Sequence, residues 1–372
     1  MPLVVLTHEF YPFRGGIAVY VEEAARAAAE NFGVTVFAPD HPSLGEQSWP
    51  LTLRPLPLRG TQSWRDRLVL ARAVRAASDE LARAVVWLPE PGALLAAMYL
   101  NALGRLPARR LVLTLHGSDI LRFAARPHRR RLFQKLLDRA DRVAVVSHHV
   151  RALLDQHFRV AAAKIAVVPG ALRSAFVDTK PAPRHRPPHA PVILLTVARV
   201  HPRKGQHAVL EALALLAQKS PVPVEYHIAG PVVHAAYRKR LEALAKKSRV
   251  PVRFLGEVPD AALPALFAQA DIFVLTPIPH GPSLEGFGLA YLEAAAHGLP
   301  AIAHRTGGVP EAVRDGLTGL LADPANRADL AAQLARLIAD PNLRAQLAHA
   351  AYARAHEHTW PDNARALFTG LD

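Results

Sequence analysis

Residues 283–298 read Ser-Leu-Glu-Gly-Phe-Gly-Leu-Ala-Tyr-Leu-Glu-Ala-Ala-Ala-His-Gly, a glycine-bracketed turn followed by a helix start. Gly286 and Gly288 let the backbone approach a ligand closely, because glycine has no side chain. The helix predicted to open near Leu289 would aim free N–H groups and the positive end of its dipole at an anion. The stretch therefore predicts a phosphate site at a helix start.

Two carboxylates accompany this site, Glu285 before the turn and Glu293 four residues into the helix. Carboxylates do not bind a phosphate, but they accept hydrogen bonds from the hydroxyls of a sugar and a ribose. The alternative is a glutamate that merely favours the helix dipole, or one that is solvated. Because Glu293 stands among apolar residues, where an unpaired carboxylate is costly, a binding role is favoured.

The chain has 372 residues, which is long for one core and favours two domains. It contains no cysteine, so a reducing compartment suits it and no disulfide framework or metal cluster is expected. The N-terminal apolar run is too short for a signal peptide, and no segment reaches the roughly 18 apolar residues of a transmembrane helix. A soluble, cytoplasmic protein is therefore expected.

The formal charge of +14 is concentrated in the N-terminal half, since residues 1–180 carry 25 Lys and Arg against 15 Asp and Glu. The densest basic run, residues 122–135, includes Arg129, Arg130 and Arg131, with apolar side chains between its charges. Such a segment can lie on an anionic membrane surface, and a solvated basic helix face is the alternative. The charge favours anionic partners and says nothing about the fold.

Strands and helices alternate along the chain, which predicts an α/β protein with parallel, doubly wound sheets. Proline-rich residues 179–191 cannot sit inside a sheet and are interpreted as a linker. They would separate domains at residues 1–178 and 192–358, with a last helix in 359–372. Strands are predicted at 3–7, 34–38, 85–88, 111–115, 143–147, 165–168, 192–197, 224–229, 252–255, 272–276 and 301–303, and helices at 17–31, 63–84, 206–219, 235–248, 261–270, 327–339, 341–357 and 362–370.

Ligands of such sheets bind beyond the carboxyl ends of the strands, and several polar or glycine residues follow predicted strands there. For the loop at residues 116–119, a plain turn in which Asp119 caps the next helix is the alternative. Cations beside a helix start can neutralise a diphosphate leaving group. The candidates in these loops are Glu9, Gly15, Gly16, His116, Asp119, Arg199 and Lys204.

Five pieces follow one another in a specific order: Gly15-Gly16, His116-Gly117-Ser118-Asp119, Arg199 with Lys204, Glu285-Gly286-Phe287-Gly288-Leu289 with Glu293, and Gly307-Gly308-Val309-Pro310-Glu311. Together they resemble the retaining GT-B glycosyltransferases of the large family 4 type, with its Glu-x7-Glu element at Glu285 and Glu293. The resemblance implies two Rossmann-like domains that face a central cleft. The N-terminal domain would hold a hydroxyl acceptor, and the C-terminal domain a nucleotide-sugar.

The resemblance also implies roles for single residues. Glu285 would contact the hydroxyls of the donor sugar and Glu293 those of the ribose, while His116 would face the far side of the sugar. Arg199 and Lys204 would bind the diphosphate, and the last helix would return to the N-terminal domain. Further donor contacts are implied for Gly15, Gly16, Gly230, Phe254, Leu255, Gly286, Phe287, Gly288 and Leu289, and acceptor contacts for Glu9 and Asp119.

The implied reaction moves a hexose from a UDP- or GDP-sugar to a hydroxyl with retention of anomeric configuration, in cell-surface glycan or glycolipid synthesis. Arg199, Lys204 and the helix dipole would stabilise the leaving diphosphate, so neither a metal nor another cofactor is required. The absence of an Asp-x-Asp triplet agrees with this expectation. The basic N-terminal half suits a lipid-linked or phosphorylated acceptor and a peripheral contact with the inner membrane face.

Two other classes of function are compatible with parts of the sequence. Nucleotide-sugar epimerisation or phosphorolysis would keep the fold, but it needs further acid/base groups or a lysine-bound pyridoxal cofactor, and no motif for either is present. A basic nucleic-acid-binding module would need interleaved aromatic side chains or a reader motif, which the sequence lacks. No specific nucleic acid partner is therefore expected.

Overall fold

The structure, a computed structural model, describes residues 1–13, 15–60, 63–181, 187, 190–216 and 222–371. The chain divides into two compact units: unit 1 comprises Met1–Ser174 with His358–Asp372, and unit 2 comprises Ala175–Glu357. The first segment of unit 1 thus ends at Ser174, before the predicted boundary at residue 178. Residues 182–186 and 188–189 of the predicted linker lie outside the described residues.

The described part of unit 1 forms a seven-stranded parallel sheet in the order β3-β2-β1-β4-β5-β6-β7. Because β1 lies between β2 and β4, the order reverses there, and a ligand site is expected at the loops that follow β1 and β4. The strands are β1 (Leu3–Leu6), β2 (Val34–Pro39), β3 (Thr52–Leu56), β4 (Val85–Leu88), β5 (Arg110–Leu115), β6 (Arg142–Val145) and β7 (Ile165–Val167).

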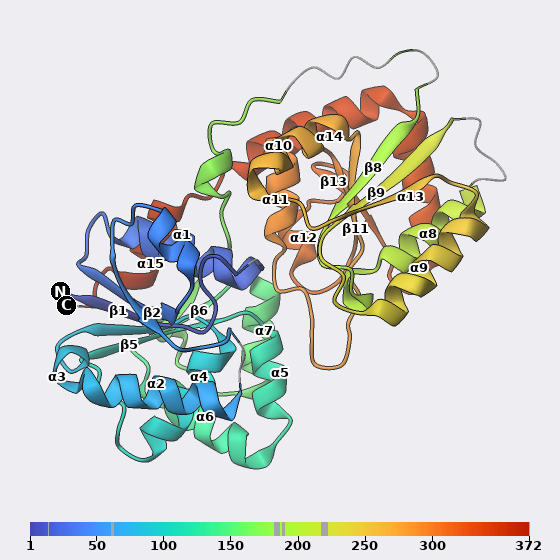
Figure 1. The fold of residues 1–372 in the computed structure, drawn as a ribbon. Helices are drawn as coiled ribbons and strands as arrows, with labels where there is room; N and C mark the ends of the chain where they lie inside the picture. The colour runs from blue at the N-terminus through green and yellow to red at the C-terminus, as the bar shows by residue number, and fades with distance from the viewer. Residues whose placement is uncertain (14, 61–62, 182–186, 188–189, 217–221, 372) are drawn as a thin grey trace. The chain divides into compact units, whose positions relative to one another are not determined.

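Helices cover both faces of this sheet (Figure 1). Helix α1 packs against α15 on one face, while α4 packs against α2 and α6 on the other. The helices are α1 (Gly16–Ala28), α2 (Trp64–Ala76), α3 (Ser78–Leu81), α4 (Pro91–Ala102), α5 (Ser118–Ala124), α6 (Pro127–Arg139), α7 (His148–His157) and α15 (Trp360–Phe368).

Helix α15 comes from the far end of the chain and completes unit 1. Its Trp360 ring lies 5.2 Å from that of Tyr20, and its Phe368 ring lies 5.3 Å from that of Trp87, both edge-on. The Nδ2 of Asn363 donates to the carbonyl of Pro169 at 2.7 Å. These contacts bury one side of α15 against residues from the first half of the chain, at least 194 positions earlier in the sequence.

Unit 2 contains a six-stranded parallel sheet in the order β10-β9-β8-β11-β12-β13 among its described residues. Its order reverses between β8 and β11, so the loops after these two strands mark its expected ligand site. The strands are β8 (Val192–Val197), β9 (Val224–Ala229), β10 (Val252–Gly256), β11 (Ile272–Leu275), β12 (Ala301–His304) and β13 (Gly319–Ala322).

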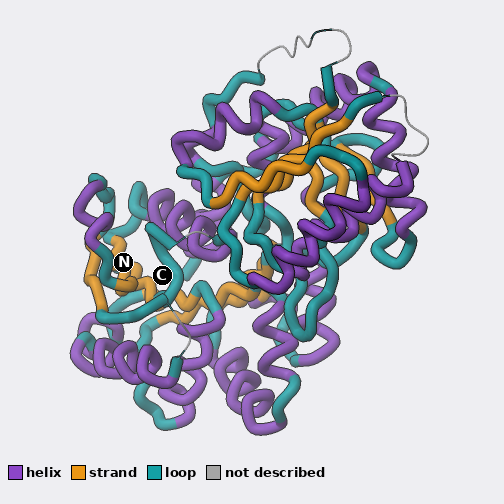
Figure 2. Tube along the Cα trace, turned by 45° about the vertical axis from the view of Figure 1, so that its right-hand side comes forward, coloured by secondary structure: helices purple, strands orange, loops and turns teal. Residues whose placement is uncertain are grey.

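Figure 2 shows the strands of this sheet, in orange, with helices in purple on either side. Helix α8 packs against α9 and α13, and α11 packs against α14. The helices are α8 (Gln206–Leu216), α9 (Ala235–Ser248), α10 (Leu263–Gln269), α11 (Leu289–Ala296), α12 (Val309–Ala312), α13 (Arg327–Ala339) and α14 (Pro341–Ala355). The prediction of two doubly wound α/β domains is confirmed.

Several elements differ from the sequence-based prediction. The helix predicted at 63–84 is broken at Ala77, which leaves the helical conformation with φ −98° and ψ 20°. Strand β3 was missed because it lies at a sheet edge and is mostly exposed, so it lacks a buried apolar pattern. Helix α4 was missed because its residues are apolar on nearly every side. Strand β13 was also missed; it has four residues and begins with a glycine, a residue that is depleted in strands.

Candidate functional site

The turn after β8 is fixed to the loop after β11. Gly205 adopts φ 74°, and a Cβ atom at this position would lie 1.7 Å from the carbonyl oxygen of Thr276. The Oγ1 of Thr276 donates to the Gly205 carbonyl at 2.9 Å, and the N–H of Ile278 donates to the Arg203 carbonyl at 2.9 Å. Only glycine fits such a close approach, so the turn that carries the cations is held in one position.

Glu285 pairs with two of these cations. Its Oε2 lies 2.7 Å from the Nζ of Lys204 and 2.9 Å from a guanidinium nitrogen of Arg203, which also donates to the Leu284 carbonyl at 3.0 Å. The three side chains are only 12–16% exposed. Buried ion pairs of this kind fix the positions of both partners.

Electrostatics keep Glu285 ionised. Burial alone would raise its pKa, but Lys204, Arg203 and Arg199 together lower the pKa of this carboxyl below its ordinary value. Burial lowers the pKa of the Lys204 ammonium, against the attraction of Glu285. Arg199 itself is exposed at the end of β8. The turn after β8 therefore carries three cationic side chains, and the loop before α11 places one carboxylate beside them.

The predicted turn Gly307-Gly308 holds the backbone of Glu285. The N–H of Gly308 donates to the Glu285 carbonyl at 3.0 Å. Gly307 has φ 57°, and a Cβ atom there would lie 2.2 Å from the same carbonyl oxygen. This explains why a glycine stands at position 307, a function that the sequence did not reveal.

Helix α11 starts at Leu289, as the sequence predicted. Gly288, its N-cap, has φ 104°, and a Cβ atom there would lie 2.6 Å from the ring of Tyr291. Because the N-cap is a glycine, it supplies no side-chain hydrogen bond to the first turn. Phe287 is buried, and Glu293 is buried one turn into the helix. The start of α11 therefore retains the anion-attracting dipole that was predicted for it.

Gly230, Phe254 and Leu255 lie at the ends of β9 and β10. Gly230 has φ 141°, its N–H donates to the carbonyl of Gly256 at 2.6 Å, and a Cβ atom would lie 2.1 Å from the Ala198 carbonyl. Its packing on the turn after β8 thus accounts for the glycine. The guanidinium of Arg238 lies over the Phe254 ring, 3.3 Å from its centroid, and Leu255 is 38% exposed.

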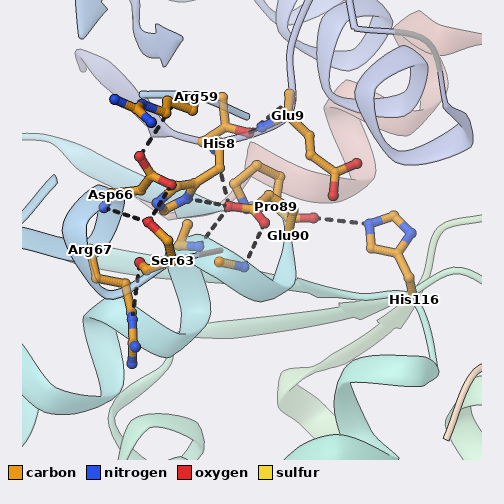
Figure 3. A network of polar contacts seen from close by, with 12 residues as sticks. His8, Glu9, Arg59, Ser63, Asp66, Arg67, Pro89, Glu90 and His116 are labelled. Atoms are coloured by element: carbon orange, nitrogen blue, oxygen red, sulfur yellow. Dashed lines mark hydrogen bonds and ion pairs between the residues drawn. The ribbon is translucent and has the colours of Figure 1, made fainter. Parts of the chain in front are cut away.

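In unit 1, a buried histidine–glutamate pair occupies the point where the strand order reverses (Figure 3). The Nδ1 of His8, after β1, lies 2.9 Å from Oε1 of Glu90, after β4, and both side chains are fully buried. The carboxylate also accepts from the N–H groups of Gly92 and Ala93, at 2.5 and 2.6 Å. Burial would raise the pKa of Glu90, but these hydrogen bonds and His8 lower it.

His116 lies beside this pair on the next strand end, where Figure 3 shows its ring directed at the carbonyl of Pro89. Its Nε2 is 2.9 Å from that oxygen, and the Tyr20 ring packs edge-on at 5.4 Å. Burial lowers the pKa of His116, with Asp119 opposing, so the ring is neutral near pH 7.

Asp119 holds the loop of His116. Its carboxylate is fully buried and accepts from the N–H groups of His116, Gly117 and Ile120 at 2.8–2.9 Å. These bonds account for the aspartate without an acceptor substrate, although the N-cap of α5 is Gly117 and not Asp119 as the alternative interpretation had it. Its predicted acceptor contact stays a prediction.

Glu9, Gly15 and Gly16 lie after β1. Glu9 is half-buried, and its backbone exchanges hydrogen bonds with the Thr7 hydroxyl at 2.8 and 3.0 Å. Gly15 is the N-cap of α1 and Gly16 its first residue, and a Cβ atom on either would meet nothing within 4 Å. Since packing does not require glycine there, the close approach of a ligand remains the predicted reason.

Sequence reasoning missed Arg203 and the pair His8–Glu90. Arg203 was overlooked because only Arg199 and Lys204 matched the family pattern, although it directly precedes Lys204. Glu90 precedes Pro91 at a helix start, which is a readable cap signal.

No described helix is both long and apolar enough to cross a membrane. No cluster of three or more possible metal ligands was found within the described ranges.

Known proteins share this architecture. Residues 14–174 match the family model "Glycosyltransferase Family 4", and residues 179–354 match "Glycosyl transferases group 1". Among solved structures, sucrose-phosphate synthase from Thermosynechococcus elongatus superposes with a TM-score of 0.81 at 22% identity, covering 98% of this chain and 96% of that one. HepE from Anabaena, solved with UDP and glucose, superposes with a TM-score of 0.76 at 22% identity, covering 98% of this chain and 97% of that one.

A relative in Mycolicibacterium smegmatis is similar over nearly the whole chain. It is the GDP-mannose-dependent alpha-(1-6)-phosphatidylinositol monomannoside mannosyltransferase, 30% identical over 93% of this chain and 91% of its own length. A D-inositol 3-phosphate glycosyltransferase of Corynebacterium efficiens is 34% identical over 63% of this chain and 57% of its own length. The chain therefore belongs to the family 4 glycosyltransferases and has the GT-B fold.

Proposed function

We propose that this glycosyltransferase moves a hexose from a nucleoside-diphosphate sugar to a hydroxyl with retention of configuration. The observation that carries the proposal is the cluster of Glu285, Lys204 and Arg203 beside the start of α11. Hydroxyls of the sugar bind the carboxylate, while the diphosphate meets the cations and the helix dipole. The GDP-mannose dependence named for the mycolicibacterial relative and the UDP-glucose bound in a HepE structure support a donor of this class.

Charge develops on the diphosphate as the glycosidic bond breaks. Lys204, Arg203 and Arg199 stabilise that charge from fixed positions, because Glu285 and the Gly205 turn already hold the first two. Three cations and a helix start are enough to offset the leaving group, so no divalent ion is needed. Attack on the same face, with the departing phosphate taking the acceptor proton, would retain the configuration without an enzyme nucleophile.

Slow hydrolysis of the donor in the absence of an acceptor is expected and identifies the substrate. UDP-, GDP- and ADP-sugars are incubated with the enzyme with and without EDTA, and the released hexose is followed by proton NMR before it mutarotates. We expect one nucleotide series to be cleaved, the configuration to be kept, and EDTA to change the rate by less than about twofold, because cations of the chain replace a metal. An inverted sugar, or complete dependence on a metal, would contradict the mechanism.

We also propose a lipid-linked or phosphorylated acceptor, and a peripheral contact with an anionic membrane through Arg129, Arg130 and Arg131. The lipid named for the mycolicibacterial relative supports this class of acceptor. Arg130 and Arg131 are exposed on the first turns of α6 and, with Arg159, line an open hollow of about 520 Å³. Cations on an exposed helix face attract anionic lipid, at roughly 1 kcal/mol each.

Changing Arg129, Arg130 and Arg131 together to Ser is expected to lower partitioning onto phosphatidylserine vesicles by about tenfold or more, from three lost cations. Sedimentation with vesicles measures this. The control replaces Lys239, Lys246 and Lys247, exposed on α9 of unit 2, by Ser, and it removes the same charge. Equal losses in both variants would indicate unspecific attraction, and no loss in either would refute the contact.

A further inference from the structure

Three histidines from three loops of unit 2 meet beside the cationic turn. His201 follows β8, His234 precedes α9, and His280 lies in the loop after β11. The ring centroid of His201 is 4.6 Å from that of His234 and 5.5 Å from that of His280, and both contacts are edge-on. The loops after β8, β9 and β11 thus supply a cluster of imidazoles that the proposed mechanism does not use.

His201 is a neutral hydrogen-bond donor. Its Nδ1 accepts the N–H of Arg203 at 3.0 Å, and a backbone N–H can only donate. The lone pair is therefore on Nδ1, and the ring hydrogen is on Nε2. Burial, followed by the nearby His234, Arg203, His280 and Arg199, lowers the pKa of His201 to about 4, so the ring stays uncharged at neutral pH.

The surroundings of the cluster favour an anion. The charged and titratable groups that face His201 are Arg199, Arg203, His234 and His280, and each of them is a cation or can become one. Glu285, the carboxylate beside this turn, is already paired with Arg203 and Lys204. His234 and His280 are exposed, and the structure records no hydrogen-bond partner for either ring among the described residues. A phosphate at this edge would therefore meet cations and imidazoles, while the carboxylate of Glu285 already has cationic partners.

We propose that His201, His234 and His280 form an additional phosphate-binding edge of the donor site, which holds a nucleoside diphosphate more tightly as the pH falls. This inference rests on the proposed function, because Arg199 and Lys204 bring the diphosphate to the adjoining turn. His201 donates its Nε2–H at any pH near neutrality. His234 and His280 add charge-assisted hydrogen bonds only when they are protonated, which a bound phosphate favours.

The pH dependence has a definite sign. A complex that binds more protons than the free protein becomes tighter as the pH falls, by the same linkage that governs folding. The gain depends on imidazolium cations, so it is expected only in the pH range in which histidine carries a proton. Phosphate groups of the ligand titrate in the same range and weaken binding in acid, but this effect is the same for every protein variant. The ratio of variant to wild-type dissociation constants therefore isolates the contribution of the His234 and His280 rings to binding.

The test compares the double variant His234→Gln and His280→Gln with the wild type. Isothermal titration calorimetry measures the binding of UDP, GDP and ADP at about pH 5.5 and pH 8, on either side of histidine titration. For the nucleotide that binds, we expect the double variant to be about tenfold weaker at the lower pH and within about twofold at the higher pH. His349 is exposed on α14, and the variant His349→Gln is the matched control, which should bind the nucleotide like the wild type at both pH values.

A third variant separates binding from support of the turn. In His201→Asn the amide oxygen can still accept the Arg203 N–H, as asparagine does in Asx turns, but the Nε2–H is lost. We expect this variant to bind about threefold to tenfold more weakly at both pH values, with a melting temperature within about 2 °C of the wild type.

The outcomes are distinct. A ratio for the double variant that is the same at both pH values overturns the inference and leaves the proposed function intact. Failure of the wild type to bind any of the three nucleotides overturns both. Since both substituted rings are exposed, the double variant should fold, and its melting temperature checks this.

Discussion

Replacement of Glu285 by alanine is expected to lower sugar transfer by about 10³-fold or more, while UDP or GDP binds within about threefold of the wild type. The carboxylate positions the transferred sugar, so its loss should act on the reaction itself. Nucleotide binding should persist because Lys204 and Arg203 lose a competing anion and stay near the start of α11. Initial rates with the cleaved donor, together with calorimetric titration of the nucleotide, measure the two effects.

The same change should destabilise unit 2. Lys204 would keep a largely buried ammonium without its partner, which costs on the order of 3 kcal/mol. Glu211→Ala is the matched control, since that carboxylate also pairs with two arginines, Arg240 and Arg327, away from the Gly205 turn. Transfer by the control should be unchanged. Transfer by the Glu285 variant within tenfold of the wild type, or a glycosyl adduct on Glu285 detected by mass spectrometry, would refute the positioning role.

Substitution of Gly205 by alanine is expected to cost about 4 kcal/mol or more of the unfolding free energy and to abolish transfer. Alanine at φ 74° costs roughly 1–2 kcal/mol by itself. The added Cβ, 1.7 Å from the Thr276 carbonyl, must also push apart the loops that follow β8 and β11. Lys204 and Arg203 would then move away from Glu285.

The variant Gly316→Ala separates the cost of the backbone conformation from the cost of the steric contact with Thr276. Gly316 has φ 72°, nearly the same as Gly205, but a Cβ atom there would meet nothing within 4 Å. Urea unfolding followed by circular dichroism should show a loss of roughly 1–2 kcal/mol for Gly316→Ala, from the backbone conformation alone. Equal losses for the two variants would mean that the contact with Thr276 contributes nothing.

Most buried strands could be predicted from sequence because each is a continuous apolar run. The predicted ranges 85–88, 192–197 and 224–229 agree with β4, β8 and β9. Edge strand β3 could not be predicted, since solvent covers most of its side chains and no periodicity marks it. Helix α4 was not predicted for the opposite reason. Its residues are so uniformly apolar that no polar face marks a helical period.

The site was predictable only as separate pieces. The loop of Glu285 and the turn of Lys204 were both identified, and their order supported the resemblance that family membership now confirms. Their contact was not predictable, because 81 residues separate Lys204 from Glu285 and only the pairing of β8 with β11 brings them together. The pair His8–Glu90 was missed for the same reason, since it depends on β1 lying beside β4.

Helix α15 has a consequence for the order in which the protein matures during translation. A ribosome synthesises residues 175–357 before it reaches Trp360, so the continuous unit 2 can be finished in the nascent chain while unit 1 still lacks its last helix. Until then, Tyr20 and Trp87 lack the aromatic partners that later cover them. Nascent chains usually complete their N-terminal domain first, but this one completes it last. The rings of Tyr20 and Trp87 thus gain these partners only after α15 has been synthesised.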